Sequence, residues 1–145
     1  MKPETRPDHL PPPIADDLIA WDAGQLRLVA SREKTTGHVV FPPRSEQDDR
    51  FERILLPAQG RLWSWTIQRF RPKSPPYAGA ETFEPYAVGY VALDDALIVE
   101  ARLSGVAFDA LRIGMPMRLV PQSFLLASGD LRTTFAFSPI DGEQP

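Results

Sequence analysis

The residue types that ordinarily carry out catalysis are scarce in this sequence. It contains no cysteine, which excludes thiolate nucleophiles, disulfide bonds and thiolate metal sites. Its two histidines, His9 and His38, are far apart along the chain, and this spacing disfavours a histidine-based metal site or a Ser-His-Asp triad. There is no P-loop and no dinucleotide-binding fingerprint. We therefore expect neither a catalytic residue nor a metal ligand in this chain.

Two pairs of adjacent acidic residues are the remaining candidates for acid–base chemistry. Asp94 and Asp95 separate two apolar runs, and they are more typical of a hairpin turn because neighbouring strand residues point to opposite faces. Asp16 and Asp17 fall in the first turn of an expected helix, where carboxylates interact favourably with the helix dipole. We interpret both pairs as structural.

Basic residues gather around an expected strand at residues 59–70 and the loop that follows it. They are Arg44, Arg61, Arg69, Arg71 and Lys73. Such a group can bind the phosphates of a ligand or an acidic partner surface. The alternative is solvated charge that balances the acidic run at residues 45–50. The predicted binding residues, taken with a neighbouring aromatic and proline motif, are Phe41, Pro42, Pro43, Arg44, Arg61 and Arg69.

The tryptophans of the same expected strand admit two interpretations. Trp63, Trp65 and Ile67 alternate with polar residues, which places them on one face of a strand. This alternation favours burial of both tryptophans in a core. If they were exposed instead, they would form a base-stacking platform like that of single-strand-binding OB-folds.

The elements needed to position these residues form a barrel in residues 51–145. Strands are expected at residues 59–70, 86–93, 96–103, 115–127 and 131–138. In the third of these, alternation places Leu97, Val99, Ala101 and Leu103 inward. Residues 106–113 predict one or two helical turns between the third and fourth strands, ended by Gly114. This is the chain order of the five-stranded OB-fold barrel, so the fold class is mainly β. The proline-rich loop at residues 72–85 is long for a compact domain and is the expected partner contact.

The part of the chain before residue 51 divides into three segments. Residues 1–13 are a flexible proline-rich arm. Residues 14–23 carry Ile14, Leu18 and Trp21 at helical spacing and predict a helix that ends at Gly24. Residues 25–50 predict a β-hairpin with little core of its own.

Composition limits the function classes. The net charge is −3 and the sequence pI about 5.4, which counts against a nucleic-acid-binding role. No apolar run approaches the ~18 residues of a membrane span. The polar start has no apolar stretch typical of a secretory signal, so a cytoplasmic location is expected.

Several short stretches together resemble the proteins in which a rubredoxin-like zinc ribbon precedes an OB-fold, known as domain of unknown function 35 (DUF35) and associated with acyl-CoA. The matching stretches are FPPR at residues 41–44, GRLWSWT at 60–66, PYAVGYVAL at 85–93, IGMPMRLV at 113–120 and FSP at 137–139. Each stretch alone is weakly specific, and their order and spacing carry the resemblance, which covers nearly the whole chain after residue 13.

The zinc-binding cysteines of that family are missing. Glu33, Thr36, Gln47 and Arg50 occupy the four positions when the chain is aligned on Gly37 and Phe41. Tetrahedral zinc requires thiolate or imidazole ligands, and none of these residues supplies one. The resemblance therefore implies a degenerate ribbon-like hairpin arm without zinc.

The resemblance implies a non-catalytic subunit that associates with a thiolase-like enzyme or a hydratase and contacts acyl-CoA. Two alternatives remain from other classes. One is a nucleic-acid-binding OB module, which the tryptophans favour and the acidic composition disfavours. The other is an independent enzyme acting on acyl thioesters, which the shortage of catalytic residues disfavours.

Overall fold

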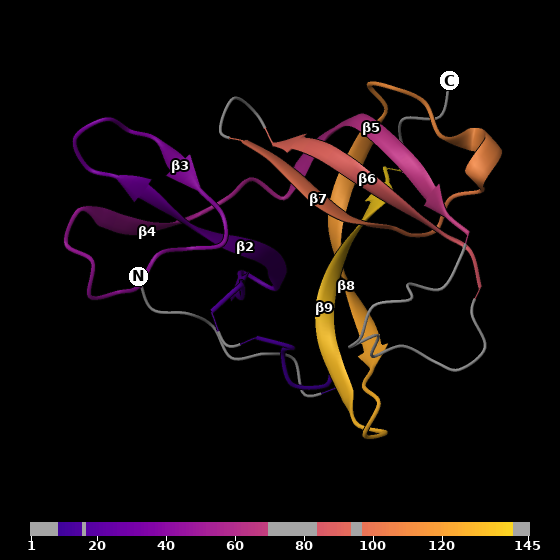
Figure 1. Cartoon of the computed structure of the whole chain (residues 1–145), viewed down its shortest axis with the longest axis horizontal. Helices are drawn as coiled ribbons and strands as arrows, with labels where there is room; N and C mark the ends of the chain where they lie inside the picture. The colour runs from indigo at the N-terminus through magenta and orange to yellow at the C-terminus, as the bar shows by residue number, and fades with distance from the viewer. Residues whose placement is uncertain (1–8, 16, 70–83, 94–96, 141–145) are drawn as a thin grey trace.

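The computed structural model describes residues 9–15, 17–69, 84–93 and 97–140 of the 145-residue chain. A four-stranded sheet near the N-terminus, here called the arm, lies beside a closed five-stranded barrel (Figure 1). The arm strands are β1 (Ile19–Asp22), β2 (Gln25–Glu33), β3 (Val39–Val40) and β4 (Phe51–Leu55). The barrel strands are β5 (Gln59–Gln68), β6 (Tyr86–Leu93), β7 (Leu97–Leu103), β8 (Pro116–Leu125) and β9 (Leu131–Pro139).

Strand β2 is the centre of the arm. It pairs antiparallel with β1, β3 and β4. Its middle residues are apolar, and Leu26, Leu28 and Ala30 are fully buried. This is the hairpin predicted at residues 25–50, and strand β1 extends its sheet.

The predicted helix at residues 14–23 is wrong. Ile19–Asp22 is a strand, and Trp21 faces Leu26 across a two-residue hairpin. Ala23 (φ 51°) and Gly24 (φ 80°) are both left-handed, as a tight hairpin turn requires, so Gly24 turns the chain instead of ending a helix. A spacing of three and four residues suits a helix locally, but pairing with the buried strand β2 decides the conformation here.

The barrel closes in the order β5-β6-β7-β9-β8. Its hairpins are antiparallel, and β7 and β9 close it with a parallel pairing of only Arg102 with Ala136 and Leu103 with Phe137. The inward residues predicted for the third strand are confirmed, since Val99, Ala101 and Leu103 are buried. The predicted five-stranded OB-fold class is therefore confirmed.

The boundary between arm and barrel differs from the one expected at residue 51. Phe51–Leu55 forms β4, which hydrogen-bonds to β2, and the first barrel strand begins at Gln59. The division of the chain into separate folding units stays a prediction.

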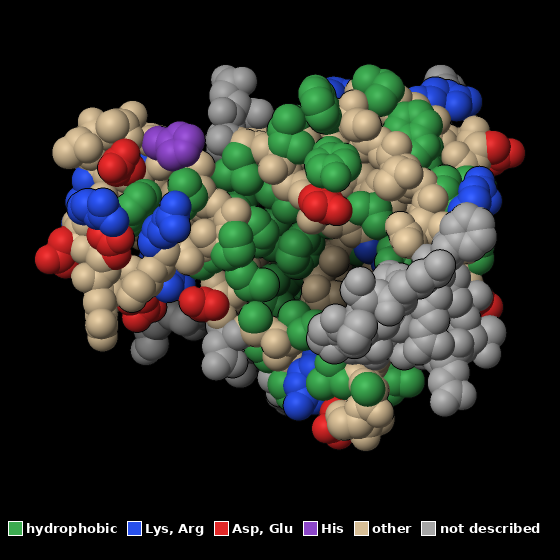
Figure 2. Space-filling view, viewed as in Figure 1, with side chains coloured by type: hydrophobic (Ala, Val, Ile, Leu, Met, Phe, Trp, Pro, Cys, Tyr) green, Lys and Arg blue, Asp and Glu red, His purple; other side chains and the backbone are tan. Residues whose placement is uncertain are grey.

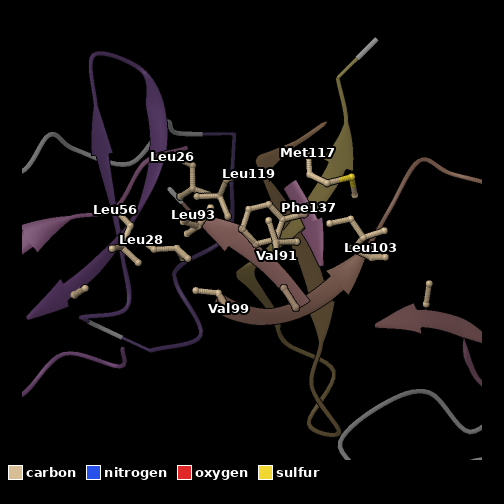
Figure 3. Close-up of a cluster of buried hydrophobic side chains, with 14 of the residues drawn as sticks. Leu26, Leu28, Leu56, Val91, Leu93, Val99, Leu103, Met117, Leu119 and Phe137 are labelled. Carbon is tan, nitrogen blue, oxygen red and sulfur yellow. The ribbon is translucent and has the colours of Figure 1, made fainter. Parts of the chain in front are cut away.

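A single hydrophobic core joins the two sheets. Leu26, Leu28 and Leu56 come from the arm side and are at most 1% exposed. They belong to the same buried cluster as Leu93 and Leu119 of the barrel (Figure 3). The arm's apolar residues therefore do not form a separate core, because they pack together with those of the barrel.

The segment between β7 and β8 contains only a short 3₁₀ helix, Phe108–Ala110, with no buried residue. Its place between the third and fourth barrel strands is the predicted one, although it is shorter than expected. Within the described residues, no helix is long and apolar enough to cross a membrane. The acidic pair at residues 94–95 and most of the loop at 72–85 lie outside the described residues.

Candidate functional site

The predicted binding motif at residues 41–44 lies where the arm meets the barrel. Phe41 is partly buried and packs against the shared core, and the peptide bond to Pro42 is cis. Pro42 is exposed and Pro43 half-buried. The backbone N–H of Arg44 donates to Ser31 Oγ at 2.8 Å, while its exposed guanidinium lies 5.7 Å from the centre of the Phe51 ring. The motif thus presents one arginine and one proline to solvent.

The other predicted binding residues lie on strand β5 and do not join this motif in one cluster. Arg61 is near the start of the strand and donates from Nη1 to the Gly114 carbonyl at 3.0 Å. Arg69 is exposed and directly follows the end of β5. At about 3.3 Å per residue the two lie roughly 26 Å apart. Arg71 and Lys73 fall outside the described residues. A shared phosphate-binding role for these residues stays a prediction.

Hydrogen bonds link the segments that carry Glu33, Thr36, Gln47 and Arg50, the four positions of the zinc-binding cysteines in the family that the sequence resembles. The Thr36 hydroxyl donates to the Glu33 carboxylate at 2.6 Å. The Gly37 N–H donates to the Glu33 carbonyl at 2.8 Å, with Gly37 at φ 78°. The Lys34 N–H donates to the Arg50 carbonyl at 2.9 Å, which ties the two halves of the hairpin together. Polar contacts thus connect the segments that carry these positions.

A bidentate ion pair between Arg50 and Asp48 stabilises the turn at residues 48–50. Arg50 donates from Nε and Nη2 to the two carboxylate oxygens of Asp48, at 3.0 and 2.9 Å. These hydrogen bonds lower the pKa of Asp48 to about 2 and raise that of Arg50. The perturbed carboxyl belongs to an exposed turn, so it serves the arm's structure and does not indicate an acid–base site.

Trp63 is exposed, which corrects the prediction that it is in the core. The register of β5 against β6 shifts between Leu62 and Ser64, and the resulting β-bulge turns Trp63 outward while Leu62 stays buried. Trp63 is 60% exposed, whereas Trp65 packs against the core as predicted. The alternation of apolar and polar residues does not indicate that β5 contains an extra residue at this point.

Trp63 belongs to an apolar surface on the outer face of strands β5, β6 and β7. Its other members are Tyr90, 37% exposed, and Ile98, 43% exposed. Ser64 faces Tyr90 and Ala92 faces Ile98 across neighbouring strands, so these side chains share one side of the sheet. We call Trp63, Tyr90 and Ile98 the outer patch. Figure 2 shows hydrophobic side chains gathered on the face over β5, β6 and β7.

The outer patch extends toward the loop between β7 and β8. Leu62 exchanges backbone hydrogen bonds with Gly114 and Met115, at 2.7 and 3.0 Å. This pairing brings the neighbouring Ile113, which is 66% exposed, close to Trp63. Glu100 faces Tyr90 and Arg61 faces Ala92, so charged side chains flank the patch. An apolar centre with charged neighbours is the usual composition of a protein-binding surface.

The expectation from the sequence is that the chain carries no metal ligand. The described residues contain no group of three or more His, Asp or Glu side chains placed to hold a metal ion. His38 is exposed. The outer patch offers an apolar and aromatic surface to solvent.

Comparisons with known proteins agree with this architecture. Residues 54–122 match the family described as ChsH2, C-terminal OB-fold domain. A solved structure described as Ltp2-ChsH2(DUF35) aldolase has a TM-score of 0.56 and 23% identity, covering 78% of this chain and 84% of that chain. At this identity the second likeness shows the fold alone.

One curated relative has a higher sequence identity. It comes from Pyrococcus furiosus and is described as a DUF35 domain-containing scaffold protein. It is 30% identical over 100 residues, which make up 66% of this chain and 69% of the relative. The chain therefore belongs to the DUF35 family.

Proposed function

We propose that this chain is a non-catalytic accessory subunit that docks onto an acyl-CoA-processing enzyme, thiolase-like or a hydratase. The observation that carries the proposal is the outer patch, where Trp63, Tyr90 and Ile98 stand exposed on the sheet. Two comparisons support a role beside an enzyme. One relative is described as a scaffold protein, and one similar structure is described as an Ltp2-ChsH2(DUF35) aldolase.

The residue types of the outer patch suit an interface. Tryptophan and tyrosine are enriched among residues that dominate binding energy, because each buries a large rigid surface at low entropic cost. Trp63 is exposed by a β-bulge, a feature that commonly re-aims a side chain at functional surfaces. Burial of Trp63 and Ile98 against a partner would remove apolar surface from water and favour association.

We also propose that the subunit contacts acyl-CoA bound to the partner enzyme. Arg61 borders the outer patch, and its hydrogen bond to the Gly114 carbonyl fixes the guanidinium there. A coenzyme A molecule held by the partner at this edge would meet a pre-positioned cation for its phosphates. Phe41, Pro42, Pro43 and Arg44 lie on the arm and Arg69 at the far end of β5, so they would contact other parts of the partner. The subunit needs no cofactor of its own, and zinc has no role in the proposal.

The test is co-expression with each thiolase-like enzyme or hydratase encoded beside this gene, followed by size-exclusion chromatography with light scattering. We expect one complex to elute and the enzyme's activity to change when the subunit is present, while the subunit alone turns over no acyl-CoA. Separate elution of both proteins at micromolar concentration, with unchanged enzyme activity, would refute the proposal.

The exposure of Trp63 also favours the second candidate, a nucleic-acid-binding module. Trp63 and Tyr90 together would form a stacking surface for single-stranded bases. Glu100 lies directly across from Tyr90, however, and its carboxylate repels a phosphate backbone. Fluorescence anisotropy with labelled single-stranded DNA at low salt separates the candidates, and binding that weakens steeply with added salt would favour the nucleic-acid role.

A further inference from the structure

A cavity opens at the parallel seam of the barrel. Strands β7 and β9 pair only at Arg102 with Ala136 and Leu103 with Phe137, so they diverge directly before this point. The resulting cavity has a volume of about 260 Å³. Its apolar walls come from Ile14, Ala101, Phe124 and Phe135, and its polar groups from Arg102, Gln122 and Thr134. We call this the seam pocket. In Figure 2 a hollow is visible in the region below β7.

The N-terminal segment supplies one wall and is fixed in place. The Ile14 N–H donates to the Thr133 carbonyl at 2.8 Å, and the Thr133 N–H donates to the Pro12 carbonyl at 2.6 Å. The buried Thr133 hydroxyl also donates to the Pro11 carbonyl at 2.6 Å. The wall carrying Ile14 is thus held by the strand that also carries Thr134 and Phe135, which preforms the pocket.

Gln122 brings an unsatisfied acceptor to the seam pocket. Its side-chain oxygen Oε1 is buried, and it has no hydrogen-bond partner among the described residues. A buried acceptor without a donor is unfavourable, because its hydration is lost and nothing replaces it. Gln122 faces Thr134 across strands β8 and β9, so the amide and the hydroxyl share one side of this hairpin. Since Gln122 lines the pocket, a rotation of its amide toward the pocket would let a bound O–H or N–H group satisfy this acceptor.

Arg102 brings a cation to the same pocket. Its guanidinium carbon lies 3.7 Å from the centre of the Tyr86 ring, which covers one face of the guanidinium. Within the described part of the chain, no carboxylate lies within salt-bridge distance of Arg102. A stacked guanidinium still has N–H groups at its edge, and a carboxylate is the acceptor that matches them best.

We propose that the seam pocket binds a small hydroxylated carboxylic acid with an apolar chain. The carboxylate pairs with Arg102, the hydroxyl donates to Gln122 Oε1, and the chain contacts Phe124, Phe135 and Ala101. The volume is larger than the ~150 Å³ cavity that holds one benzene molecule, which leaves room for a medium-length chain. The site is separate from the outer patch, so the proposal stands whether or not the accessory role does.

Calorimetric titration of the full chain with three probes tests each contact. They are 3-hydroxyoctanoate, octanoate and 2-octanol. We expect 3-hydroxyoctanoate to bind about tenfold more tightly than octanoate, since only it satisfies the Gln122 acceptor, and 2-octanol to bind more weakly than 3-hydroxyoctanoate, since it lacks the carboxylate.

Two variants assign these preferences to residues. In Gln122→Met the two acids should bind equally, and the unliganded protein should melt at a higher temperature because the unsatisfied acceptor is gone. In Arg102→Met the preference for 3-hydroxyoctanoate over 2-octanol should disappear. Gln59→Met is the matched control, since Gln59 is exposed and outside the pocket, and it should leave all three affinities unchanged.

Nuclear magnetic resonance keeps the test decisive if a variant does not fold. Adding 3-hydroxyoctanoate to the wild-type chain should shift the amide signals of Ala101, Phe124 and Thr134. Absence of saturable binding at millimolar concentration, equal affinity of the wild type for both acids, or shifts confined to the outer patch would each overturn the proposal.

Discussion

The ring of Phe41 meets the ring of Phe135 edge to face, with 6.1 Å between centroids and 80° between planes. Phe41 follows the last strand of the arm's hairpin, and Phe135 lies on barrel strand β9. Both side chains are partly buried against the shared core. Phe135 also lines the seam pocket. This one contact therefore connects the arm, the barrel and the cavity.

We predict a favourable coupling between these two rings. An edge-to-face aromatic pair contributes about 0.5–1.5 kcal/mol beyond the burial of its surface. A double-mutant cycle with Phe41→Leu and Phe135→Leu, measured by urea unfolding, should give a coupling free energy of about 1 kcal/mol. Strictly additive effects would show that arm and barrel are held by the leucine core alone.

Gly60 should tolerate no side chain. A Cβ added there would collide with the Ala92 carbonyl oxygen and lie 2.8 Å from Leu93 Cδ2. A Cβ at Gly89 would instead meet the side-chain ends of Leu103 and Leu62, at 2.7 and 2.9 Å. Overpacking of a core costs about 1–3 kcal/mol. We expect Gly60→Ala to lower the free energy of unfolding more than Gly89→Ala. The backbone carbonyl beside Gly60 can move less than the leucine methyl groups beside Gly89. The reverse order in thermal unfolding would contradict this.

The Thr133 hydroxyl should anchor the N-terminal segment to β9. Thr133→Val keeps the side-chain shape but removes the hydrogen bond to the Pro11 carbonyl. Leaving one partner of a buried pair unsatisfied costs about 1–3 kcal/mol, so we expect a loss in that range in unfolding measurements. Thr66→Val, at an exposed position of β5, is the control and should change little. A Thr133 variant as stable as the control would show that the anchor does not matter.

The Asp48–Arg50 pair should make part of the arm's stability depend on pH. The pKa of Asp48 is lowered from 3.8 to about 2. A carboxyl whose folded pKa is depressed stabilises the protein fully above its unfolded pKa, and this contribution is lost as the pH falls from about 4 through about 2. Asp48→Asn should remove this part of the acid-induced loss, while Asp49→Asn should retain it. Direct observation of the Asp48 carboxyl titrating near 4 would be inconsistent with the pairing seen in the structure.

The sequence predicted the barrel better than the arm's first residues, for physical reasons. Alternation along β7 reports burial directly, so Val99, Ala101 and Leu103 were placed correctly. Around Trp21, apolar spacing suited a helix as well as a strand, and the decision came from pairing with β2, which local periodicity does not report.

The candidate sites were harder to predict because they depend on tertiary detail. A single extra residue in β5 reverses the face on which Trp63 lies, and alternating sequence carries no signal for such a bulge. The seam pocket joins Ile14, Arg102 and Gln122, which are distant in sequence and meet only where two barrel strands diverge. Nearness in sequence suggests that Arg44, Arg61 and Arg69 form one group, whereas the structure spreads these residues over the arm and both ends of a strand.

The central claim is that the outer patch is a docking surface, and the dissociation constant of a purified complex tests it most directly. The subunit would be titrated into the acyl-CoA-processing enzyme with which it co-elutes, as wild type, as Trp63→Ser and as Leu131→Ser. Leu131 is a matched control, because it is also an exposed hydrophobic residue, 49% accessible, at the distant tip of the β8–β9 hairpin. Loss of a central aromatic side chain costs at least ~2 kcal/mol, so Trp63→Ser should weaken binding about thirtyfold or more and Leu131→Ser less than about threefold. Equal affinity of wild type and Trp63→Ser would contradict the account.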